Sequence, residues 1–308
     1  MSGPWRVLVS DRLAETGMTI LQQEAEAVLD DPGALGTVDA WIVRSRTRVD
    51  GASLTAAVPR LRVVGRAGVG VDNIDLEAAR REKVVVVSAP EASTIAVAEH
   101  TLALMLALAR QIPSGDAALR RGEWPKGRLE GTELYGKTLG LVGIGRIGRA
   151  VAERAAAMGM AVIAYDPYLA EETIRTSGAR PAQLNELLDA SDYVSLHLPL
   201  TDETRHMFGS EAMARMKPGA RLICAARGGL IDEPALLTAL EEQRLAGAAL
   251  DVFQNEPPGE NPLLRHPHVV ATPHLGAQTA EAQARVAADI ASEVLAALRG
   301  DPLRWRVV

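Results

Sequence analysis

Cysteine is almost absent from this sequence, and so are long apolar runs. The single cysteine, Cys224, excludes an internal disulfide framework and suits a reducing cytosol. The longest helical apolar stretch, Thr101 to Ala109, is far too short to span a membrane. Residues 1–11 lead directly into a strand-like run and lack the apolar core of a secretory signal. These absences predict a cytoplasmic protein that does not associate with membranes.

An excess of positive charge and the spacing of metal ligands are missing as well. The formal net charge of −6 at pH 7 argues against a general nucleic-acid binder. No group of cysteines and histidines has the spacing of metal ligands, so we expect no metal. The 308 residues exceed the range of about 250–300 at which a single core stops growing. Two domains are therefore the default expectation.

Short apolar runs alternate with helical patterns along the chain, which predicts an α/β fold with parallel sheets. The strands expected first are Val7–Val9, Trp41–Val43, Leu61–Gly65 and Val84–Val87, with helices at Leu13–Glu24 and Asp75–Arg81. The later strands are Tyr193–His197, Arg221–Ala225, Ala248–Val252 and Val269–Ala271. A last helix, Ala277–Arg299, has one apolar face formed by Val286, Ile290, Val294 and Leu298. We expect it to pack back on the first domain, which makes that domain discontinuous.

A glycine-rich motif between two predicted strands points to a dinucleotide. The apolar run 139–142 breaks into G-x-G-x-x-G at residues 143–148, and a helix follows. The next apolar run ends at Asp166, eighteen residues after Gly148. The glycines permit a tight turn, close approach to a pyrophosphate and tight packing of helix on strand, while the helix N-terminus attracts the phosphates. The carboxylate of Asp166 can accept hydrogen bonds from both hydroxyls of the adenosine ribose. Its negative charge would repel a 2′-phosphate, which favours NAD over NADP.

Three later strands end in polar residues that suit hydride transfer. Arg227, Glu256 and His274 follow these strands, and parallel strands share one carboxyl edge. Imidazole titrates near neutral pH, so His274 can take a hydroxyl proton. Arg227 can bind a carboxylate and polarise a carbonyl, while Glu256 can fix the imidazole tautomer. Simpler interpretations remain open, because His274 could be a turn residue, Glu256 an exposed loop acid and Arg227 a helix cap.

An arginine-rich stretch in the first domain suggests an anion site. Six arginines occur from Arg44 to Arg66 against one acid, Asp50, and most could be solvated surface. Arg44 and Arg66, however, directly follow two strands, and guanidinium groups bind carboxylate or phosphate bidentately. Ser45 and the glycine-rich stretch Gly65–Gly70 add hydroxyl and backbone donors.

The remaining polar residues receive plainer interpretations. His197 ends a strand and is a candidate to line the cofactor, whereas Cys224 is expected to be buried packing. No convergence with other polar groups is expected for four histidines, which we interpret as structural or surface residues: His100, His206, His266 and His268.

A long helix and an irregular arm precede the dinucleotide motif. The helix begins near Ser93 or Thr94, and its expected buried side contains Ile95, Leu102, Met105 and Leu106. Residues 113–135 lack clear periodicity and include Trp124. An arm of this kind usually packs on something, and a partner subunit is the natural candidate.

Together these motifs resemble those of the NAD-dependent D-2-hydroxyacid dehydrogenase family. The matching segments are 143–148, Ala226–Gly229, Leu250–Pro257 and Pro273–Ala277, and they occur in the family's order. Residues 43–47 and 65–73 are most similar to the branch that acts on 3-phospho-D-glycerate. The resemblance implies two Rossmann-like or flavodoxin-like parallel-sheet domains. An NAD-binding domain, residues 91–279, is inserted in a discontinuous substrate-binding domain, residues 1–90 and 280–308.

The resemblance also implies roles for individual residues. Arg227, Glu256 and His274 match the catalytic positions. Cofactor-binding positions match Gly143, Gly145, Arg146, Ile147, Gly148, Asp166, Pro167, His197, Pro199, Thr204, Ala225, Asp251 and Gly276. Substrate-binding positions match Arg44, Ser45, Arg66, Gly68 and Val69. Family members are usually homodimers, in which the partner's arm can lend a basic residue, here Lys126 or Arg128.

The function that the resemblance implies is NAD-dependent oxidation of 3-phospho-D-glycerate to 3-phosphohydroxypyruvate in serine biosynthesis. The nearest alternative is a glyoxylate or hydroxypyruvate reductase, or another D-2-hydroxyacid dehydrogenase, acting on a different small anionic 2-hydroxy or 2-keto acid. An alternative of another class is an NAD(H)-sensing corepressor that has the same fold and no turnover.

The sequence departs from the family's pattern in three places. Cys224 stands where the family often has Asn, and Ser88-Ala89-Pro90 stands where Asn-x-Pro is common. The sequence also ends at Val308, without the C-terminal regulatory domains of longer members. Feedback inhibition by serine through such a domain is therefore not expected.

Overall fold

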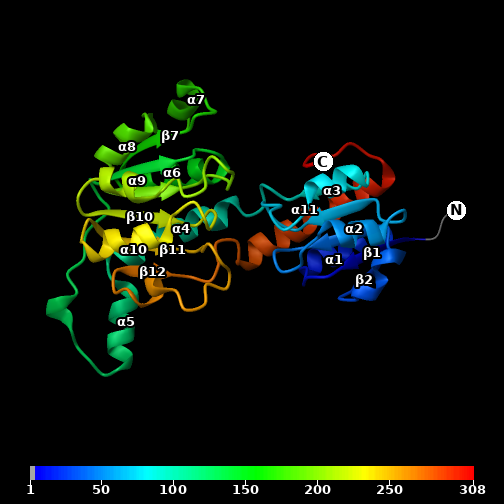
Figure 1. The fold of residues 1–308 in the computed structure, drawn as a ribbon, viewed down its shortest axis with the longest axis horizontal. Coiled ribbons are helices and arrows are strands. Elements are labelled where there is room, and N and C mark those ends of the chain that lie inside the picture. The colour runs from blue at the N-terminus through cyan, green and yellow to red at the C-terminus, as the bar shows by residue number, and fades with distance from the viewer. Residues whose placement is uncertain (1–3) are drawn as a thin grey trace. The chain divides into compact units, whose positions relative to one another are not determined.

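The computed structural model describes residues 4–308, which divide into two compact units (Figure 1). Unit 1 comprises the chain up to Thr94 together with Ala277–Val308, and unit 2 comprises Ile95–Gly276. Each unit has its own parallel sheet. The expected α/β architecture of two parallel-sheet units, one of them discontinuous, is confirmed.

Unit 1 contains a five-stranded sheet in the order β2-β1-β3-β4-β5, the flavodoxin-like order. Its strands are β1 (Trp5–Val9), β2 (Ala25–Leu29), β3 (Ala40–Val43), β4 (Val63–Arg66) and β5 (Val85–Ser88). Its helices are α1 (Glu15–Leu21), α2 (Gly51–Ala57), α3 (Leu76–Arg81) and α11 (Ala280–Arg299), with a 3₁₀ turn η1 (Pro32–Thr37). Alternate strand residues enter two cores, so that Val7 and Val9 pack on the α1 and α11 side and Leu8 on the α2 and α3 side.

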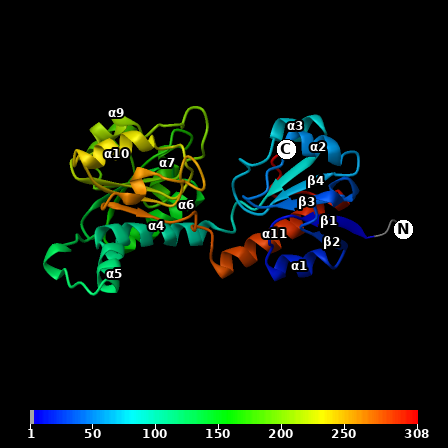
Figure 2. The same cartoon turned by 60° about the horizontal axis from the view of Figure 1, so that its bottom comes forward.

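Helix α11 brings the end of the chain back to unit 1 and lies beside α1 (Figure 2). Its four predicted apolar residues are all buried. Burying side chains of this size contributes about 1.5–3 kcal/mol each. The helix approaches β4 so closely that a Cβ at Gly65 would lie 2.5 Å from Cγ2 of Val294. Glycine at this position therefore permits the close packing of α11 on the sheet.

Unit 2 contains a seven-stranded sheet in the order β12-β11-β10-β9-β6-β7-β8. Its strands are β6 (Thr138–Val142), β7 (Ala161–Tyr165), β8 (Arg180–Pro181), β9 (Tyr193–Leu196), β10 (Ala220–Cys224), β11 (Leu245–Leu250) and β12 (Val269–Ala271). Its helices are α4 (Thr94–Ala109), α5 (Ile112–Arg120), α6 (Arg146–Ala157), α7 (Glu171–Thr176), α8 (Leu184–Ala190), α9 (Ser210–Arg215) and α10 (Glu233–Glu241), with 3₁₀ turns η2 (Lys126–Arg128) and η3 (Pro262–Arg265). Strand order reverses at β6, and ligands of such sheets bind at the carboxyl ends beside this reversal.

The chain between β5 and β6 differs from its prediction in two respects. Residues 112–120 form helix α5, although residues 113–135 were expected to be irregular. Ile95 is 45% exposed, although it was expected on the buried side of the long helix. Helix α4 is apolar around most of its circumference, so the sequence does not define a single buried face.

Among residues 4–308, no single helix could cross a membrane, and α4 and α5 meet the length requirement only as a pair bent by 64°.

Two short strands were not predicted. Strand β2 pairs with β1 at the edge of its sheet, and β8 has two residues. Most of β2 is only partly buried, so it lacks the continuous apolar run that marks the central strands.

Candidate active site

The glycine-rich turn lies between β6 and α6, at the reversal of strand order. Gly143 has a φ of +91°, which favours glycine. A Cβ at Gly148 would lie 2.5 Å from the carbonyl oxygen of Gly143, so the helix packs tightly on the turn. A Cβ at Gly145, in contrast, would meet no atom within 4 Å. This open space over Gly145 is where the backbone of the turn can approach a pyrophosphate.

The start of helix α6 suits an anion. Gly145 is the N-cap and offers no side chain to the N–H groups of the first turn. The first turn also contains no acidic residue. The positive end of the helix dipole and these N–H groups therefore favour a bound phosphate. The residues present thus fit a dinucleotide.

Asp166 lies directly after β7 and is held in place by two backbone N–H groups. Its Oδ2 accepts a hydrogen bond from Ile144 at 3.1 Å, and its Oδ1 accepts one from Tyr168 at 3.0 Å. Each carboxylate oxygen can accept a second bond. Asp166 is therefore fixed against the glycine-rich turn with acceptor capacity remaining for ribose hydroxyls.

Other predicted cofactor positions lie in the loops after β9 and β10. The hydroxyl of Thr204 donates to the carbonyl of Pro199 at 2.7 Å, which closes the loop between them. Nε2 of His197 lies 3.0 Å from Oγ of Ser195. Burial lowers the pKa of His197 to about 4, so its imidazole is neutral at pH 7. Ala225 directly follows β10.

Glu256 and His274 lie in direct contact. Oε2 of Glu256 is 2.7 Å from Nδ1 of His274, and the two side chains are 39% and 45% exposed. Glu256 follows β11 and His274 follows β12, and these strands are neighbours in the sheet. Burial by itself would raise the pKa of Glu256, but the hydrogen bond and charge of His274 together with the N–H of Phe253 outweigh it and lower this pKa below its ordinary value. Glu256 is therefore ionised at neutral pH and can stabilise a protonated imidazole.

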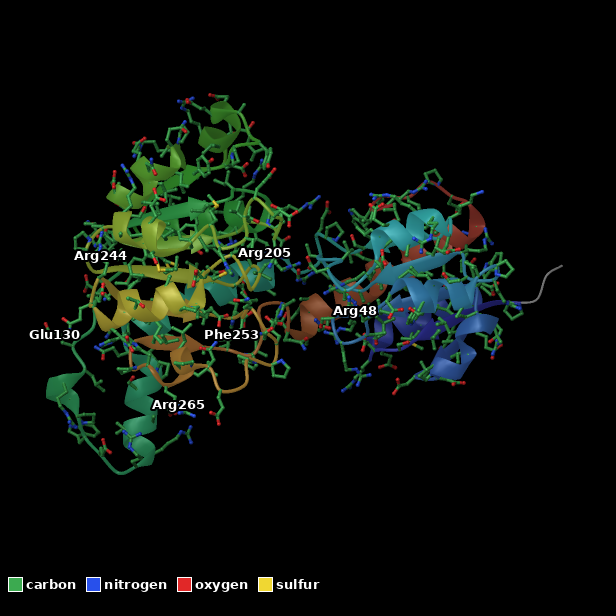
Figure 3. The ribbon with its side chains drawn as sticks, viewed as in Figure 1. Arg48, Glu130, Arg205, Arg244, Phe253 and Arg265 are labelled. Atoms are coloured by element: carbon green, nitrogen blue, oxygen red, sulfur yellow. The ribbon has the colours of Figure 1, made fainter. Side chains whose placement is uncertain are left out.

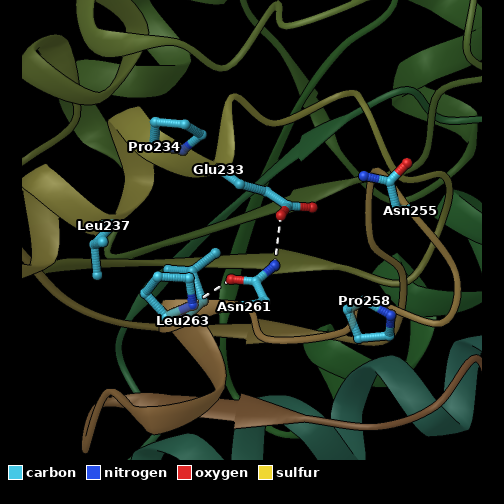
Figure 4. A pocket seen from close by; sticks show the side chains of 8 residues that line it. Glu233, Pro234, Leu237, Asn255, Pro258, Asn261 and Leu263 are labelled. Carbon is cyan, nitrogen blue, oxygen red and sulfur yellow. Dashed lines mark hydrogen bonds between the residues drawn. The ribbon is translucent and has the colours of Figure 1, made fainter.

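The loop that carries Glu256 is anchored at both ends by Glu233 of α10. One oxygen of Glu233 accepts from the backbone N–H of Gln254 at 2.6 Å. The other accepts from the side-chain amide of Asn261 at 2.6 Å (Figure 4). A pocket of about 290 Å³ lies among these side chains. The backbone N–H of Phe253, labelled in Figure 3, donates to Oε1 of Glu256 at 3.2 Å. Glu256 is thus bound on one oxygen by the loop and on the other by His274.

Arg227 lies in a turn that packs against the start of this loop. A Cβ at Gly228 would lie 1.8 Å from the carbonyl oxygen of Phe253, so only glycine allows the two segments to touch. Arg227 is partly buried, and its Nη1 donates to the carbonyl of Ala226 at 2.6 Å. The structure therefore places the turn of Arg227 beside the loop of Glu256, which in turn contacts His274.

Asp251 organises the segment around His274. Its side chain is 1% exposed and accepts hydrogen bonds from the N–H groups of Leu275 at 2.7 Å and Gly276 at 2.8 Å, and from the hydroxyl of Thr272 at 2.5 Å. Burial would raise the pKa of Asp251, but hydrogen bonding, most strongly from His100, lowers it below its ordinary value. The expectation that His100 converges with no other polar group is wrong. The one feature of the sequence that could have indicated a role for His100 is that a titratable residue lies within an apolar helix.

The predicted anion-binding residues belong to unit 1, where two side chains shape the loop after β3. Asp11 accepts from the backbone N–H of Arg44 at 2.6 Å, and Asn73 donates to the carbonyls of Arg44 and Thr47. The guanidinium of Arg44 donates to the side chain of Gln278 at 3.2 Å.

The loop after β4 has its own constraint. A Cβ at Gly68 would lie 1.7 Å from Nη1 of Arg66, so glycine makes room for this guanidinium. Gly68 also has a φ of +147°. Val69 is 37% exposed, and Ser45 in the preceding loop is exposed.

Among residues 4–308, no group of three or more histidine, cysteine, aspartate or glutamate side chains could hold a metal ion.

Comparisons with known proteins identify the family of this chain. Residues 102–276 match the family model described as D-isomer specific 2-hydroxyacid dehydrogenase, NAD binding domain. The chain is 47% identical over 305 residues to the D-3-phosphoglycerate dehydrogenase of Bacillus subtilis (strain 168), which covers 97% of this chain and 58% of that protein. It is 47% identical over 304 residues to that of Methanocaldococcus jannaschii, with 96% and 58% covered. The chain thus spans less than two thirds of the length of these curated relatives.

Solved structures are similar over the whole chain. The TT0316 protein from Thermus thermophilus is 38% identical with a TM-score of 0.88, covering 98% of this chain and 100% of that one. A glyoxylate reductase from Paecilomyes thermophila is 31% identical with a TM-score of 0.90, covering 100% and 99%.

The fold and the glycine-rich motif of unit 2 define a dinucleotide-binding protein. The chain belongs to the D-isomer specific 2-hydroxyacid dehydrogenases, and unit 2 contains their NAD-binding domain. Its cofactor is accordingly NAD. The predicted family membership and cofactor are both confirmed.

Proposed function

We propose that this protein oxidises 3-phospho-D-glycerate to 3-phosphohydroxypyruvate with NAD, the reaction that opens serine biosynthesis. The observation that carries the chemistry is the 2.7 Å contact between Glu256 and His274 at the carboxyl edge of the dinucleotide-binding sheet. The choice of substrate is supported by relatives named D-3-phosphoglycerate dehydrogenase, which match both units at 47% identity.

His274 acts in this proposal as the general base. Its Nε2 takes the proton from the substrate's 2-hydroxyl, while Nδ1 stays bonded to the ionised Glu256. The bond to Glu256 fixes the ring and stabilises the positive charge that it gains. Arg227 binds the substrate carboxylate and holds the reacting carbon in place. NAD, when bound, supplies the acceptor for the hydride that leaves this carbon.

Residues of unit 1 supply the substrate's anion recognition in this proposal. Residues 1–90 and 280–308 form the substrate-binding domain, and residues 91–279 form the NAD-binding domain. Arg44 and Arg66 bind the acidic groups of the substrate, supported by donors from the loops after β3 and β4. These loops contain the remaining proposed substrate residues, Ser45, Gly68 and Val69.

Asp166 sets the preference for NAD over NADP in this proposal. Its oxygens accept hydrogen bonds from the adenosine ribose hydroxyls, and its charge repels a 2′-phosphate. The predicted positions around it complete the dinucleotide site: Gly143, Gly145, Arg146, Ile147, Gly148, Pro167, His197, Pro199, Thr204, Ala225, Asp251 and Gly276.

We also propose a homodimer in the cytoplasm. Large apolar side chains are exposed on and after α5, and Ile112, Leu119 and Trp124 are 54%, 56% and 80% exposed. A second copy of the chain is a natural partner for such residues. The single, buried Cys224 suits a reducing compartment.

A substrate panel followed by NADH absorbance tests the activity. We expect turnover of 3-phosphoglycerate with NAD, and a kcat/KM for phosphohydroxypyruvate reduction at least about 100-fold above that for hydroxypyruvate, because losing a clamped phosphate costs several kcal/mol. Equal kcat/KM values would favour a hydroxypyruvate reductase. NADH binding without any 2-hydroxyacid turnover would favour a sensor.

A further inference from the structure

A second imidazole, that of His100 on α4, contacts the residues that organise the His274 segment. Its Nε2 lies 3.1 Å from Oγ1 of Thr272 and 3.2 Å from Oδ1 of Asp251. The side chain of His100 is 19% exposed and that of Asp251 is 1% exposed. Water therefore competes little for these hydrogen bonds, and their loss would leave a buried carboxylate short of a donor.

The donors and acceptors available determine which atom carries the proton. Asp251 is ionised at neutral pH because its pKa is lowered, so its oxygens only accept. Thr272 has one hydroxyl hydrogen, which it donates to Oδ1 of Asp251 at 2.5 Å. Nε2 of His100 therefore carries a hydrogen and donates it to the oxygens of Thr272 and Asp251.

The carboxylate that His100 contacts holds both flanks of His274. The carboxylate of Asp251 accepts a hydrogen bond from the hydroxyl of Thr272, before His274 in the chain. It also accepts hydrogen bonds from the N–H groups of Leu275 and Gly276, after His274. Its backbone carbonyl accepts from the N–H of His274 at 2.9 Å. His274 itself has a φ of +54°, a left-handed conformation that non-glycine residues rarely adopt. Such a conformation persists only when neighbouring bonds impose it.

We propose that His100 is a positioning residue for the dehydrogenase reaction, an inference that rests on the proposed function. It holds Thr272 and Asp251 together, and they hold the segment 272–276 in the conformation that presents His274 to Glu256. His100 does not touch the reacting atoms in this proposal. Its removal leaves the base present but poorly placed, so that kcat falls and the glycine-rich dinucleotide site is unchanged.

The test compares His100→Ala with His100→Gln, whose amide can still donate. His268→Ala is the matched control, because His268 is an exposed histidine of the same unit. We expect kcat for 3-phosphoglycerate oxidation to fall about 10- to 100-fold in His100→Ala, as for a reacting group misplaced by about 1 Å. The KM for NAD should change by a smaller factor than kcat, because the glycine-rich turn is intact and only Asp251 and Gly276 of the proposed dinucleotide site are affected. His100→Gln should recover much of kcat, and the control should match wild type.

Hydrogen exchange provides a readout that does not depend on activity. The amides of Leu275 and Gly276 should exchange faster in His100→Ala than in wild type, since their acceptor is no longer fixed. The proposal would be overturned if the amides of Leu275 and Gly276 exchanged at the same rate in His100→Ala as in wild type. It would also be overturned if kcat fell equally in His100→Ala and His100→Gln. If His100→Ala does not fold, Thr272→Ser, which keeps the hydroxyl, and the isosteric Thr272→Val replace the first pair. If wild type does not oxidise 3-phosphoglycerate, the proposed function fails, and the exchange comparison still decides the role of His100.

Discussion

At the scale of single residues, accessibility separates the groups proposed to react from those that hold them. Glu256 and His274 are 39% and 45% exposed, as groups that meet a substrate must be. Asp251 is 1% exposed and its oxygens are occupied by neighbouring donors. A buried carboxylate with several donors is rigid, and rigidity behind a reactive imidazole preserves its orientation.

Replacing His274 by Asn tests the proposed base. We expect kcat for 3-phosphoglycerate oxidation to fall by about 10²–10⁴-fold, the usual contribution of a general base. Asn can still occupy the left-handed backbone conformation at this position, so the fold should be retained. Steady-state kinetics and a thermal melt measure the two effects, with His268→Asn as control. Near-normal turnover in His274→Asn would remove His274 from the mechanism.

At the scale of elements, glycines decide how closely segments approach. Because Gly65 has no side chain, α11 can pack closely on β4. The absence of a side chain at Gly228 likewise allows the turn of Arg227 to contact the Glu256 loop. In the dinucleotide turn, Gly148 is confined by the protein itself, whereas Gly145 faces open space. The same residue type thus serves folding at one position and ligand approach at another.

Two alanine substitutions separate these roles. Gly145→Ala should leave the melting temperature unchanged but raise the Kd for NADH at least about tenfold, or 1.4 kcal/mol, because its methyl group occupies the approach of the pyrophosphate. Gly148→Ala should destabilise the protein by about 1–3 kcal/mol, because its Cβ would overlap the carbonyl of Gly143. Melting curves and NADH fluorescence titrations measure both. An unchanged Kd in Gly145→Ala would contradict the assignment of this space to the dinucleotide.

At the scale of the whole molecule, two separately folded units divide the proposed tasks. Unit 2 contains the dinucleotide turn, Arg227, Glu256 and His274, while unit 1 contains Arg44 and Arg66. Each unit has its own buried core on its own sheet. Unit 2 also contains buried and partly buried carboxylates with lowered pKa values, so the stability of the molecule should depend on pH.

Stability should fall in acid because several carboxylates have lowered pKa values. Burial by itself would raise the pKa of Asp251, Glu256 and Asp192, but for each of them the hydrogen bonds taken together, with nearby positive charges for Glu256 and Asp192, outweigh it. Their contribution is therefore present above the ordinary carboxyl pKa of about 4 and is lost as pH falls through the lower folded-state values. Asp289 acts in the opposite sense, because burial raises its pKa.

Urea unfolding at pH 7, 5 and 3.5 measures this dependence. We expect the free energy of unfolding to decrease most between pH 5 and 3.5, where the unfolded chain binds more protons than the folded one. Asp192→Asn is the informative variant, because it lies outside the proposed site and removes one of the three groups. Its stability should vary less with pH than that of wild type. A wild-type protein as stable at pH 3.5 as at pH 7 would contradict the shifts.

Periodicity and spacing in the sequence determined the central strands, the glycine-rich turn and the apolar face of α11, because these features are local. The edge strand β2 and helix α5 escaped prediction because partial burial and an exposed helix leave weak patterns. The sequence also singled out Arg227, Glu256 and His274 as polar residues that follow parallel strands. Only the tertiary structure decided that His100, more than 150 positions from Asp251 and Thr272, meets them. Such a contact depends on how a buried helix packs on a sheet, and no local pattern encodes it.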